Sequence, residues 1–408
     1  MNESSLVHAI RRNSLLLCVV QAVSTFSFQV MSVVNSLAIF ELSGSATLAG
    51  LALATFWIGR ISISYFSGWL MDRTTRKRVL LLGGIIATAS MIGTSVFFVA
   101  KDVIGILFSL LVYGIGYTIL SQNRIPMSDM YKQSNMGTAI GYLYSSSIIG
   151  SIAAIPLIIF GDFISITYRI GIYPSLWLLG AFSLVFSILS AIMMKPDTKE
   201  IAVRLKSILP KDESDSKDSV ISRRRSDSVI VAFIVSALNW SIMVAMMSFL
   251  SLDMGQSNFS LTLISTTITI HTIGMYAFSA PIGKMVDKLG AKRFMVCGSI
   301  LTGVGALLTP LSVNYFTITL GMFLVGIGWS IAVVSTTAVI ANATRVAMRG
   351  KVLGLNDLII GVTAAGVTFV AGVVITLGGP LGFGMYGFAL SIPAIVPALI
   401  MKPDSTKL

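Results

Sequence analysis

The stretch Gly68-Trp69-Leu70-Met71-Asp72-Arg73-Thr74-Thr75-Arg76-Lys77-Arg78 is a short basic loop between two long apolar runs. A looser copy of it occurs at Gly283-Lys284-Met285-Val286-Asp287-Lys288-Leu289-Gly290-Ala291-Lys292-Arg293. The glycines that open the two stretches are 215 positions apart, and so are the two aspartates. A repeat at about half the chain length predicts two related halves, each with this loop at the same place.

The composition is typical of a membrane protein. Of the 408 residues, 55% are hydrophobic and only 11% are charged, and the mean hydropathy is +0.87. Soluble domains carry about 25% charged residues, so this chain has too little polar surface to cover a water-soluble globule. The net charge of +12 would suit nucleic acid, but the cations lie beside apolar runs, where they act as topology signals. We expect a polytopic protein in a lipid bilayer, with no nucleic-acid partner.

Twelve apolar runs are long enough to cross a bilayer, which takes about 20 helical residues. They lie at about 14–40, 46–71, 78–100, 103–124, 137–160, 172–194, 228–252, 260–285, 293–312, 314–341, 351–377 and 380–401. Residues 195–227 are charged, Ser-rich and free of aromatic residues, as in a solvated linker. We therefore expect an all-α membrane protein with an N-terminal bundle at 1–194, a cytoplasmic linker at 195–227 and a C-terminal bundle at 228–408.

Two further pairs of segments support the repeat. Met194-Lys195-Pro196-Asp197 returns as Met401-Lys402-Pro403-Asp404, and Gly137-Thr138-Ala139-Ile140-Gly141 corresponds to Gly350-Lys351-Val352-Leu353-Gly354. Glycines four residues apart lie on one face of a helix and let a second helix approach closely. We expect such close approaches where the fifth and eleventh helices begin.

The two basic loops resemble the signature loop of the major facilitator superfamily, Gly-x-Leu-x-Asp-Arg-x-Gly-Arg-(Arg/Lys), which joins the second and third helices of each six-helix half. The first loop has Thr75 where the pattern has a glycine, whereas Gly290 keeps it. The resemblance implies twelve transmembrane helices in two pseudo-symmetric six-helix bundles that transport a solute by alternating access.

The resemblance also implies partners for the loop residues. In this family the loop aspartate, here Asp72, faces the N-terminus of the eleventh helix, where free N–H groups favour an anion. By pseudo-symmetry, Asp287 should face the start of the fifth helix. Arg76 matches an arginine that pairs with an acid at the end of the fourth helix, here Asp129. The expected signature-loop and gating residues are Gly68, Asp72, Arg73, Arg76, Asp129, Gly283, Asp287 and Lys292.

The topology follows from the lysines and arginines. With both termini and the linker in the cytoplasm, nearly all the loop cations lie inside, and only Lys101 and Arg169 lie outside. This orientation satisfies the positive-inside rule. The cations placed inside, besides those of the linker, are Arg73, Arg76, Lys77, Arg78, Arg124, Lys132, Lys284, Lys288, Lys292, Arg293, Arg345, Arg349 and Lys351.

Charges within the apolar runs are the sharpest functional lead, because a central charge costs at least about 2.5–3.5 kcal/mol. Arg60 falls near the middle of the second run, and Asp357 lies about two turns inside the eleventh. Three interpretations of Arg60 stay open: it binds an anionic substrate, it forms a state-dependent ion pair with Asp357, or it lines a wet cavity with a structural role. Asp357 is also a candidate proton-coupling carboxylate.

Other polar and aromatic residues within the runs are candidates for the wall of a substrate cavity. His271, in the eighth run, is either a hydrogen-bonded structural residue or a coupling or ligand residue. The remaining candidates are Gln29, Asn239, Trp240, Tyr113 and Trp329. Each is weak alone, because polar residues also join helices to one another.

The sequence thus predicts a secondary transporter in the cell membrane, a symporter or antiporter, working as a monomer. The first substrate hypothesis is a small organic anion or anionic metabolite, with protons as the coupling ion. The alternatives are an exporter of drugs or hydrophobic compounds and a transporter-like receptor that no longer transports. No nucleotide-binding loop, metal cluster or nucleophile–base pattern occurs, so we expect no enzyme activity, no cofactor and no metal.

Overall fold

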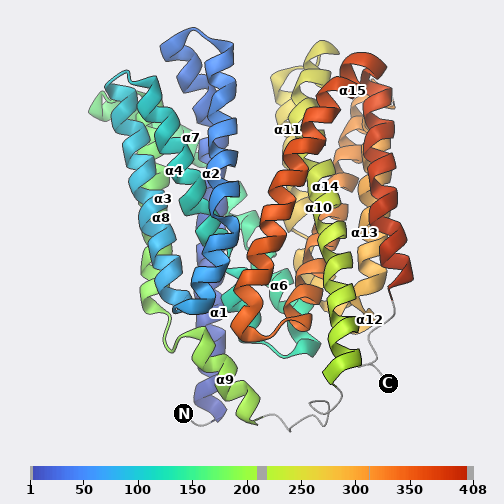
Figure 1. Ribbon diagram of the computed structural model, residues 1–408. Helices are drawn as coiled ribbons and strands as arrows, with labels where there is room; N and C mark the ends of the chain where they lie inside the picture. The colour runs from blue at the N-terminus through green and yellow to red at the C-terminus, as the bar shows by residue number, and fades with distance from the viewer. Residues whose placement is uncertain (1–2, 209–217, 312, 402–408) are drawn as a thin grey trace. The chain divides into compact units, whose positions relative to one another are not determined.

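The computed structural model describes residues 3–208, 218–311 and 313–401 (Figure 1). These residues form helices joined by short turns, and no strand occurs among them. The helices are α1 (Glu3–Ser43), α2 (Ala46–Arg73), α3 (Arg76–Val99), α4 (Val103–Ser121), α5 (Arg124–Asp129), η1 (Gln133–Asn135), α6 (Met136–Ser145), α7 (Ser147–Tyr168), α8 (Ile172–Met193), α9 (Thr198–Ile208), α10 (Asp218–Gln256), α11 (Leu261–Tyr276), α12 (Ser279–Leu289), α13 (Ala291–Leu308), α14 (Tyr315–Ala343), η3 (Val346–Met348) and α15 (Arg349–Ile400).

Every predicted apolar run falls on a helix or a pair of helices. Eight segments of the described chain are long and apolar enough to cross a membrane, which confirms an integral, all-α architecture. The fifth run is divided into α6 and α7, the eighth into α11 and α12, and the last two are joined in α15. The count of twelve spans stays a prediction.

The helix ends follow local chemistry. Thr75, which replaces the glycine of the family pattern, accepts a hydrogen bond from the Arg78 N–H and so caps the first turn of α3. Within α15, Gly379 adopts a positive φ of 63° directly before Pro380. This backbone conformation suits glycine, and the proline cannot continue the hydrogen-bond pattern. The chain therefore turns at Gly379, between the eleventh and twelfth apolar runs.

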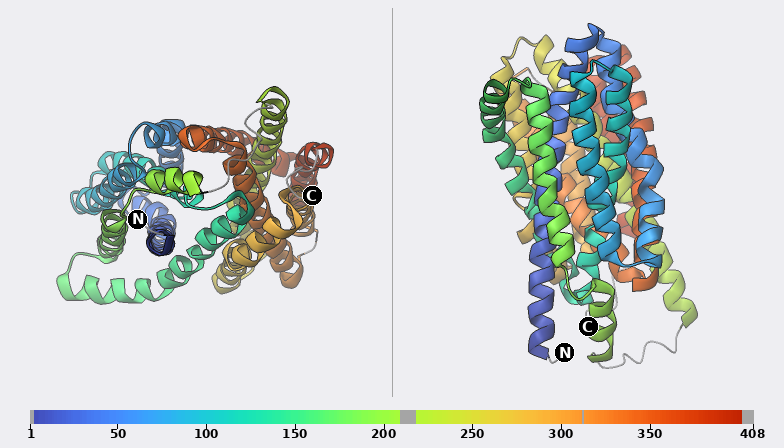
Figure 2. Two further views of the ribbon diagram at one scale, coloured as in Figure 1. Left: turned by 90° about the horizontal axis from the view of Figure 1, so that it is seen from below. Right: turned by 90° about the vertical axis from the view of Figure 1, so that its left-hand side faces the viewer.

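The first compact unit contains the chain up to Met130, the part from Ser146 to the end of α9, and Val346–Leu358. In it, α3 packs against α4 and α8, α4 also packs against α2, and α1 packs against α7 and α8. Figure 2 shows these helices side by side. Its core is built around two fully buried aromatic side chains, Trp177 and Tyr113.

The second compact unit contains Tyr131–Ser145, the chain from the linker to Arg345, and the part of α15 from Ile359 onward. There α14 packs against α10, α11 and α13, and α6 packs against α12. Its core includes Trp329 and a cluster of methionine side chains.

The two units do not coincide residue by residue with the two sequence halves. The start of the fifth helix (α6) belongs to the second unit, and the start of the eleventh (the first turns of α15) belongs to the first. These are the two segments whose paired glycines predicted close approach. The division of the chain at 194 and 228 stays a prediction about the repeat.

Candidate functional site

The end of α2 meets the start of α15 in the first unit. Asp72 accepts hydrogen bonds from the Gly350 N–H (N···O 3.0 Å) and the Lys351 N–H (2.6 Å). These amides belong to the first turn of α15 and have no acceptor within the helix. The carboxylate therefore satisfies them and complements the positive end of the helix dipole. This contact is the one that the resemblance implied for Asp72.

Glycines make the contact possible. A Cβ on Gly68 would lie 2.0 Å from the Gly350 carbonyl oxygen, and a Cβ on Gly350 would lie 2.3 Å from that of Gly68. The two backbones thus touch directly, and any side chain at either position would separate them. The same reciprocal arrangement joins Gly137 and Gly283 in the second unit, where the corresponding distances are 2.6 and 2.1 Å.

Behind Asp72 lies a buried cluster of charges. Arg76, fully buried, donates from Nε to Asp129 Oδ2 (2.9 Å), from NH1 to Asp72 Oδ1 (2.8 Å) and from NH2 to the Val346 carbonyl (2.9 Å). Arg349 donates from NH1 to Asp129 Oδ1 and to the Ser128 carbonyl, both at 2.9 Å. Two arginines face two aspartates, so the cluster is electrically balanced, as buried charges require. The family resemblance pointed to Arg76 and Asp129 but not to Arg349.

The corresponding site of the second unit has the carboxylate without the arginines. Asp287 accepts from the Gly137 N–H (2.7 Å) and the Thr138 N–H (2.6 Å) at the start of α6. Ala291 and Asn342 occupy the positions of Arg76 and Asp129, and Asn342 instead exchanges hydrogen bonds with Gln133. The two contacts therefore share a helix N-terminus and differ in buried charge.

Of the other loop residues, Arg73 lies on the ring of Trp69, with 4.6 Å between the guanidinium carbon and the ring centroid. Lys292 is half-buried in the first turn of α13.

The start of the linker folds back onto the signature loop. Lys199 in α9 donates from Nζ to the carbonyls of Asp72 (2.6 Å) and Thr74 (2.5 Å), and so caps the C-terminus of α2. Asp197 accepts from the Lys77 N–H (3.2 Å) at the first turn of α3. Burial, with the nearby Arg76 cation, holds the pKa of Lys199 below its ordinary value despite the surrounding aspartates.

Asp357 forms an ion pair with Arg124, a partner that the sequence analysis did not name. Arg124 NH2 contacts Asp357 Oδ1, and Gln122 donates to Asp357 Oδ2 at 2.9 Å. Arg124 is 5% exposed and Asp357 12%. The sequence placed Arg124 among the loop cations of the cytoplasmic side. The structure adds that α4 ends before Arg124 and that its side chain is buried at the start of α5.

Arg60 lies within one residue of the midpoint of α2 and is half-buried. Its guanidinium carbon lies 5.0 Å from the ring centroid of Trp57 and 5.5 Å from that of Tyr117. Tyr117 also packs against Phe28 and Phe56, at centroid distances of 5.2 and 5.7 Å. The cation therefore sits at the edge of an aromatic cluster, where cation–π attraction partly offsets the loss of water.

Further candidates of the first unit lie at the same helices. Tyr113, fully buried on α4, shares a hydrogen bond of 2.8 Å with Ser27 of α1. Gln29, two residues after Ser27 on α1, is half-buried. Gln21 accepts from Asn123 Nδ2 (2.9 Å) and donates to Ser147 Oγ (2.8 Å). These hydrogen bonds join α1 to α4 and to α7.

The second unit holds the remaining candidates. Asn239 Nδ2 donates to Ser299 Oγ at 2.9 Å. His271 Nδ1 donates to the Met322 carbonyl at 2.7 Å, since a carbonyl can only accept, and its Nε2 has no partner among the described residues. Trp240 and Trp329 pack edge to face, with ring centroids 5.0 Å apart. Sequence reasoning missed Tyr144 and Tyr276, which pack on the same Trp329 ring.

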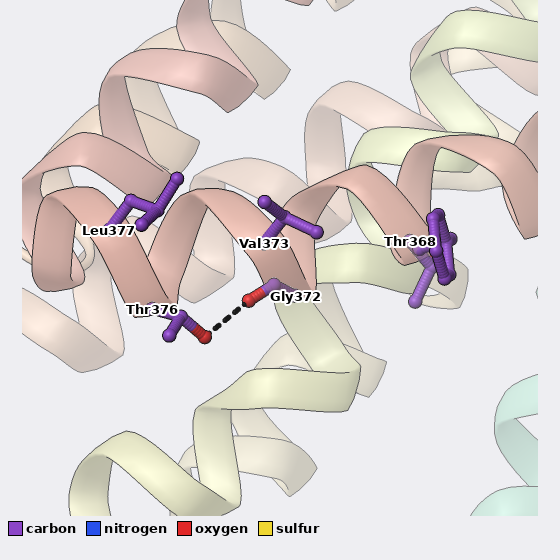
Figure 3. Close-up of a pocket in the computed structure, with 6 residues that line it drawn as sticks. Thr368, Gly372, Val373, Thr376 and Leu377 are labelled. Carbon is purple, nitrogen blue, oxygen red and sulfur yellow. Dashed lines mark hydrogen bonds between the residues drawn. The ribbon is translucent and has the colours of Figure 1, made fainter.

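A hollow along the outer part of α15 is a different kind of feature (Figure 3). It is lined by Thr368, Phe369, Gly372, Val373, Thr376 and Leu377, and Thr376 donates within the helix to the Gly372 carbonyl. Phe369 is 76% exposed and Leu377 83%, so this face is apolar and open. We place no binding site there, because its lining contains no charged side chain.

Comparison with known proteins agrees with this geometry. The sequence profile of the Major Facilitator Superfamily matches residues 17–255 and 229–407. The chain belongs to this superfamily. An uncharacterised superfamily transporter of Bacillus subtilis, YddS, is 24% identical over 67% of this chain, and the chain spans 63% of that relative's length. The riboflavin transporter RfnT of Brucella anthropi is 23% identical over 97% of each chain.

Solved structures of superfamily members share the fold. The human organic anion transporter MFSD10 has a TM-score of 0.73 at 14% identity and covers 96% of this chain and 99% of its own. The proton:xylose symporter XylE has a TM-score of 0.72 at 15% identity, with 98% and 96% covered. At these identities the likeness defines the architecture alone. The superfamily match, together with the long apolar helices, makes the chain an integral membrane transporter of the solute-carrier type, and its family is one of transporters rather than enzymes.

Proposed function

We propose that this protein carries a small organic anion across the cell membrane by alternating access, as a monomer with its termini and linker in the cytoplasm. The observation that carries the proposal is Arg60, a permanent cation at the middle of α2 and beside an aromatic cluster. A charge at that depth is costly unless it has a function or a partner. Asp357, its possible partner in one of the three interpretations, forms an ion pair with Arg124.

The surroundings of Arg60 suit a carboxylate. The guanidinium carbon lies within cation–π distance of the rings of Trp57 and Tyr117, and a planar guanidinium matches the bidentate geometry of a carboxylate. A carboxylate bound there would form charge-assisted hydrogen bonds with the guanidinium.

Proton coupling is the finer part of the proposal, and Asp357 is its first candidate. Its carboxylate is held by one cation and one amide in a mostly buried place. Protonation would weaken the bond to Arg124, so loading and unloading of a proton would be linked to the contacts of α5 with α15. His271 is the second candidate, because its Nε2 is buried and available to accept a proton.

The test is a thermal-shift screen of the purified protein with organic anions, sugars, amino acids and lipophilic cations, followed by uptake into proteoliposomes. A ligand that binds the folded state raises the melting temperature. We expect carboxylates to stabilise the wild type, Arg60→Lys to weaken this effect, and Arg60→Ala to abolish it. Equal stabilisation of all three proteins by hydrophobic cations would refute the anion and favour export of hydrophobic compounds.

Coupling is tested in the same proteoliposomes. An inwardly directed proton gradient should drive uptake by the wild type, whereas Asp357→Asn should retain solute exchange and lose the response to the gradient. His271→Gln is the comparison. Gradient-driven uptake that is unchanged in both variants would exclude Asp357 and His271 as the coupling residues. Uptake by the wild type that does not respond to the gradient would remove proton coupling from the proposal.

A further inference from the structure

Four aromatic side chains of the second unit form a group that we call the aromatic box: Tyr144, Trp240, Tyr276 and Trp329. Trp329 is at its centre, with the ring centroids of Trp240, Tyr276 and Tyr144 at 5.0, 5.9 and 6.1 Å. All three pairs are edge to face, the geometry that aromatic rings favour. The box therefore draws one ring from each of α6, α10, α11 and α14.

The box lies where helices are interrupted. Trp329 is the middle residue of α14, Tyr144 is followed by the break between α6 and α7, and Tyr276 is the last residue before the break between α11 and α12. The Ala280 N–H of α12 donates to Ser145 Oγ at 2.8 Å, which joins the two interrupted segments. Discontinuous helices at mid-depth are where transporters of this architecture build binding sites.

The centre of the box has an unused hydrogen-bond donor. Trp329 is 2% exposed, and its Nε1–H has no acceptor among the described residues. A buried polar group without a partner is unfavourable, and native structures contain few of them. The flanking rings of Tyr144, Trp240 and Tyr276 are only half-buried. A ligand would reach these rings first and the indole N–H behind them.

We propose that the aromatic box binds a planar heteroaromatic ring, and that a ring nitrogen or ring carbonyl of this ligand accepts a hydrogen bond from Trp329 Nε1. The inference rests on the proposed function and refines it: the transported solute is a heteroaromatic carboxylate. Aromatic side chains would hold the ring by offset and edge contacts, which tolerate different substituents. The buried donor would supply selectivity, because a ring without an acceptor leaves it unpaired.

The test uses three carboxylates: quinoline-3-carboxylate, naphthalene-2-carboxylate and cyclohexanecarboxylate. The first two have the same shape and charge and differ in one ring nitrogen, and the third has no aromatic ring. Dissociation constants are measured by titration calorimetry on the full-length protein in detergent near neutral pH. We expect the wild type to bind the quinoline compound roughly fivefold more tightly than the naphthalene compound.

Trp329→Phe keeps a ring and removes the N–H, so it should reduce this ratio to about one. Trp69→Phe, at the far end of α2, is the matched control and should leave the ratio unchanged. If Trp329→Phe does not fold, Tyr276→Ala serves instead: it should weaken both aromatic carboxylates and spare cyclohexanecarboxylate.

The outcomes separate the two proposals. If the wild type shows no preference for the quinoline compound, or Trp329→Phe retains it, the aromatic box is not the ring site. The anion proposal then still stands as long as Arg60→Ala weakens all three carboxylates. If no carboxylate binds the wild type, the anion proposal fails and the refined substrate class fails with it.

Discussion

Replacing Asp129 by asparagine should release the start of α15 from the signature loop. The Asp129 side chain is fully buried and accepts hydrogen bonds from Arg76 and Arg349, both at 2.9 Å. The substitution leaves two buried guanidinium groups with one carboxylate, that of Asp72. Removing one partner of a buried ion pair costs about 3–5 kcal/mol. We take about 3 kcal/mol, because the asparagine oxygen can still accept one hydrogen bond.

This free energy should shift the equilibrium of the contact between the signature loop and the start of α15 from its formed state toward an open state. About 1.4 kcal/mol corresponds to a tenfold change in an equilibrium, so the open state should become on the order of 100-fold more populated. Hydrogen exchange reads this population directly. The Gly350 and Lys351 amides have Asp72 as acceptor and none within the helix. Their exchange should therefore accelerate by a similar factor.

The second unit supplies the control within the same molecule. The Gly137 and Thr138 amides are held in the same way by Asp287, without buried arginines. In Asp129→Asn their exchange should stay as in the wild type, and in Asp287→Asn they alone should exchange faster. Equal acceleration at both places would mean general loosening and would refute the assignment of the effect to the charge cluster. Unchanged exchange at Gly350 would refute it as well.

Two further predictions concern stability. Gly68→Ala should lower the unfolding midpoint in an SDS titration, because its Cβ would lie 2.0 Å from the Gly350 carbonyl oxygen. Gly366→Ala is the control and should leave the midpoint unchanged, because no atom lies within 4 Å of a Cβ at that position. Equal midpoints for the two variants would contradict the close approach of Gly68 and Gly350. Lys199→Met should remove a pH dependence of the free energy of unfolding. The pKa of Lys199 in the folded protein lies below the unfolded value of 10.5, so between these two pKa values the unfolded chain binds more protons than the folded chain. The wild type therefore gains stability as the pH rises through that window. A wild-type minus variant difference that falls with pH in that window would show the opposite sign.

The sequence predicted correctly the residues whose role depends on backbone contacts and on their place in the repeated motif. A glycine that touches another backbone and an aspartate on a helix N-terminus depend on spacing, so Gly68, Asp72, Gly283 and Asp287 could be found from a motif that occurs twice. The apolar runs likewise located the helices, because span length is set by the bilayer.

The sequence was less informative where partners depend on side-chain direction. Arg124 follows an apolar run directly and looks like any cation at a membrane surface, yet it turns inward to Asp357. A usable signal was present: Gln122 and Asn123 precede it, and a buried acid requires a cation at similar depth. For Tyr144 no such signal existed, because its position depends on a break between α6 and α7 that has no proline near it. The break after Tyr276 had one: Pro281 lies four residues after Ala277, where a proline disrupts the helix.

Each compact unit includes the first turns of a helix from the other half of the sequence, and this has a consequence for dividing the gene. A cut in the linker would produce two polypeptides, and each would contain one segment that packs in the other's unit: Tyr131–Ser145 from the first fragment and Val346–Leu358 from the second. Neither fragment could complete its own fold alone. Co-expression should therefore rescue fragments that separately are degraded, and the two products should purify together.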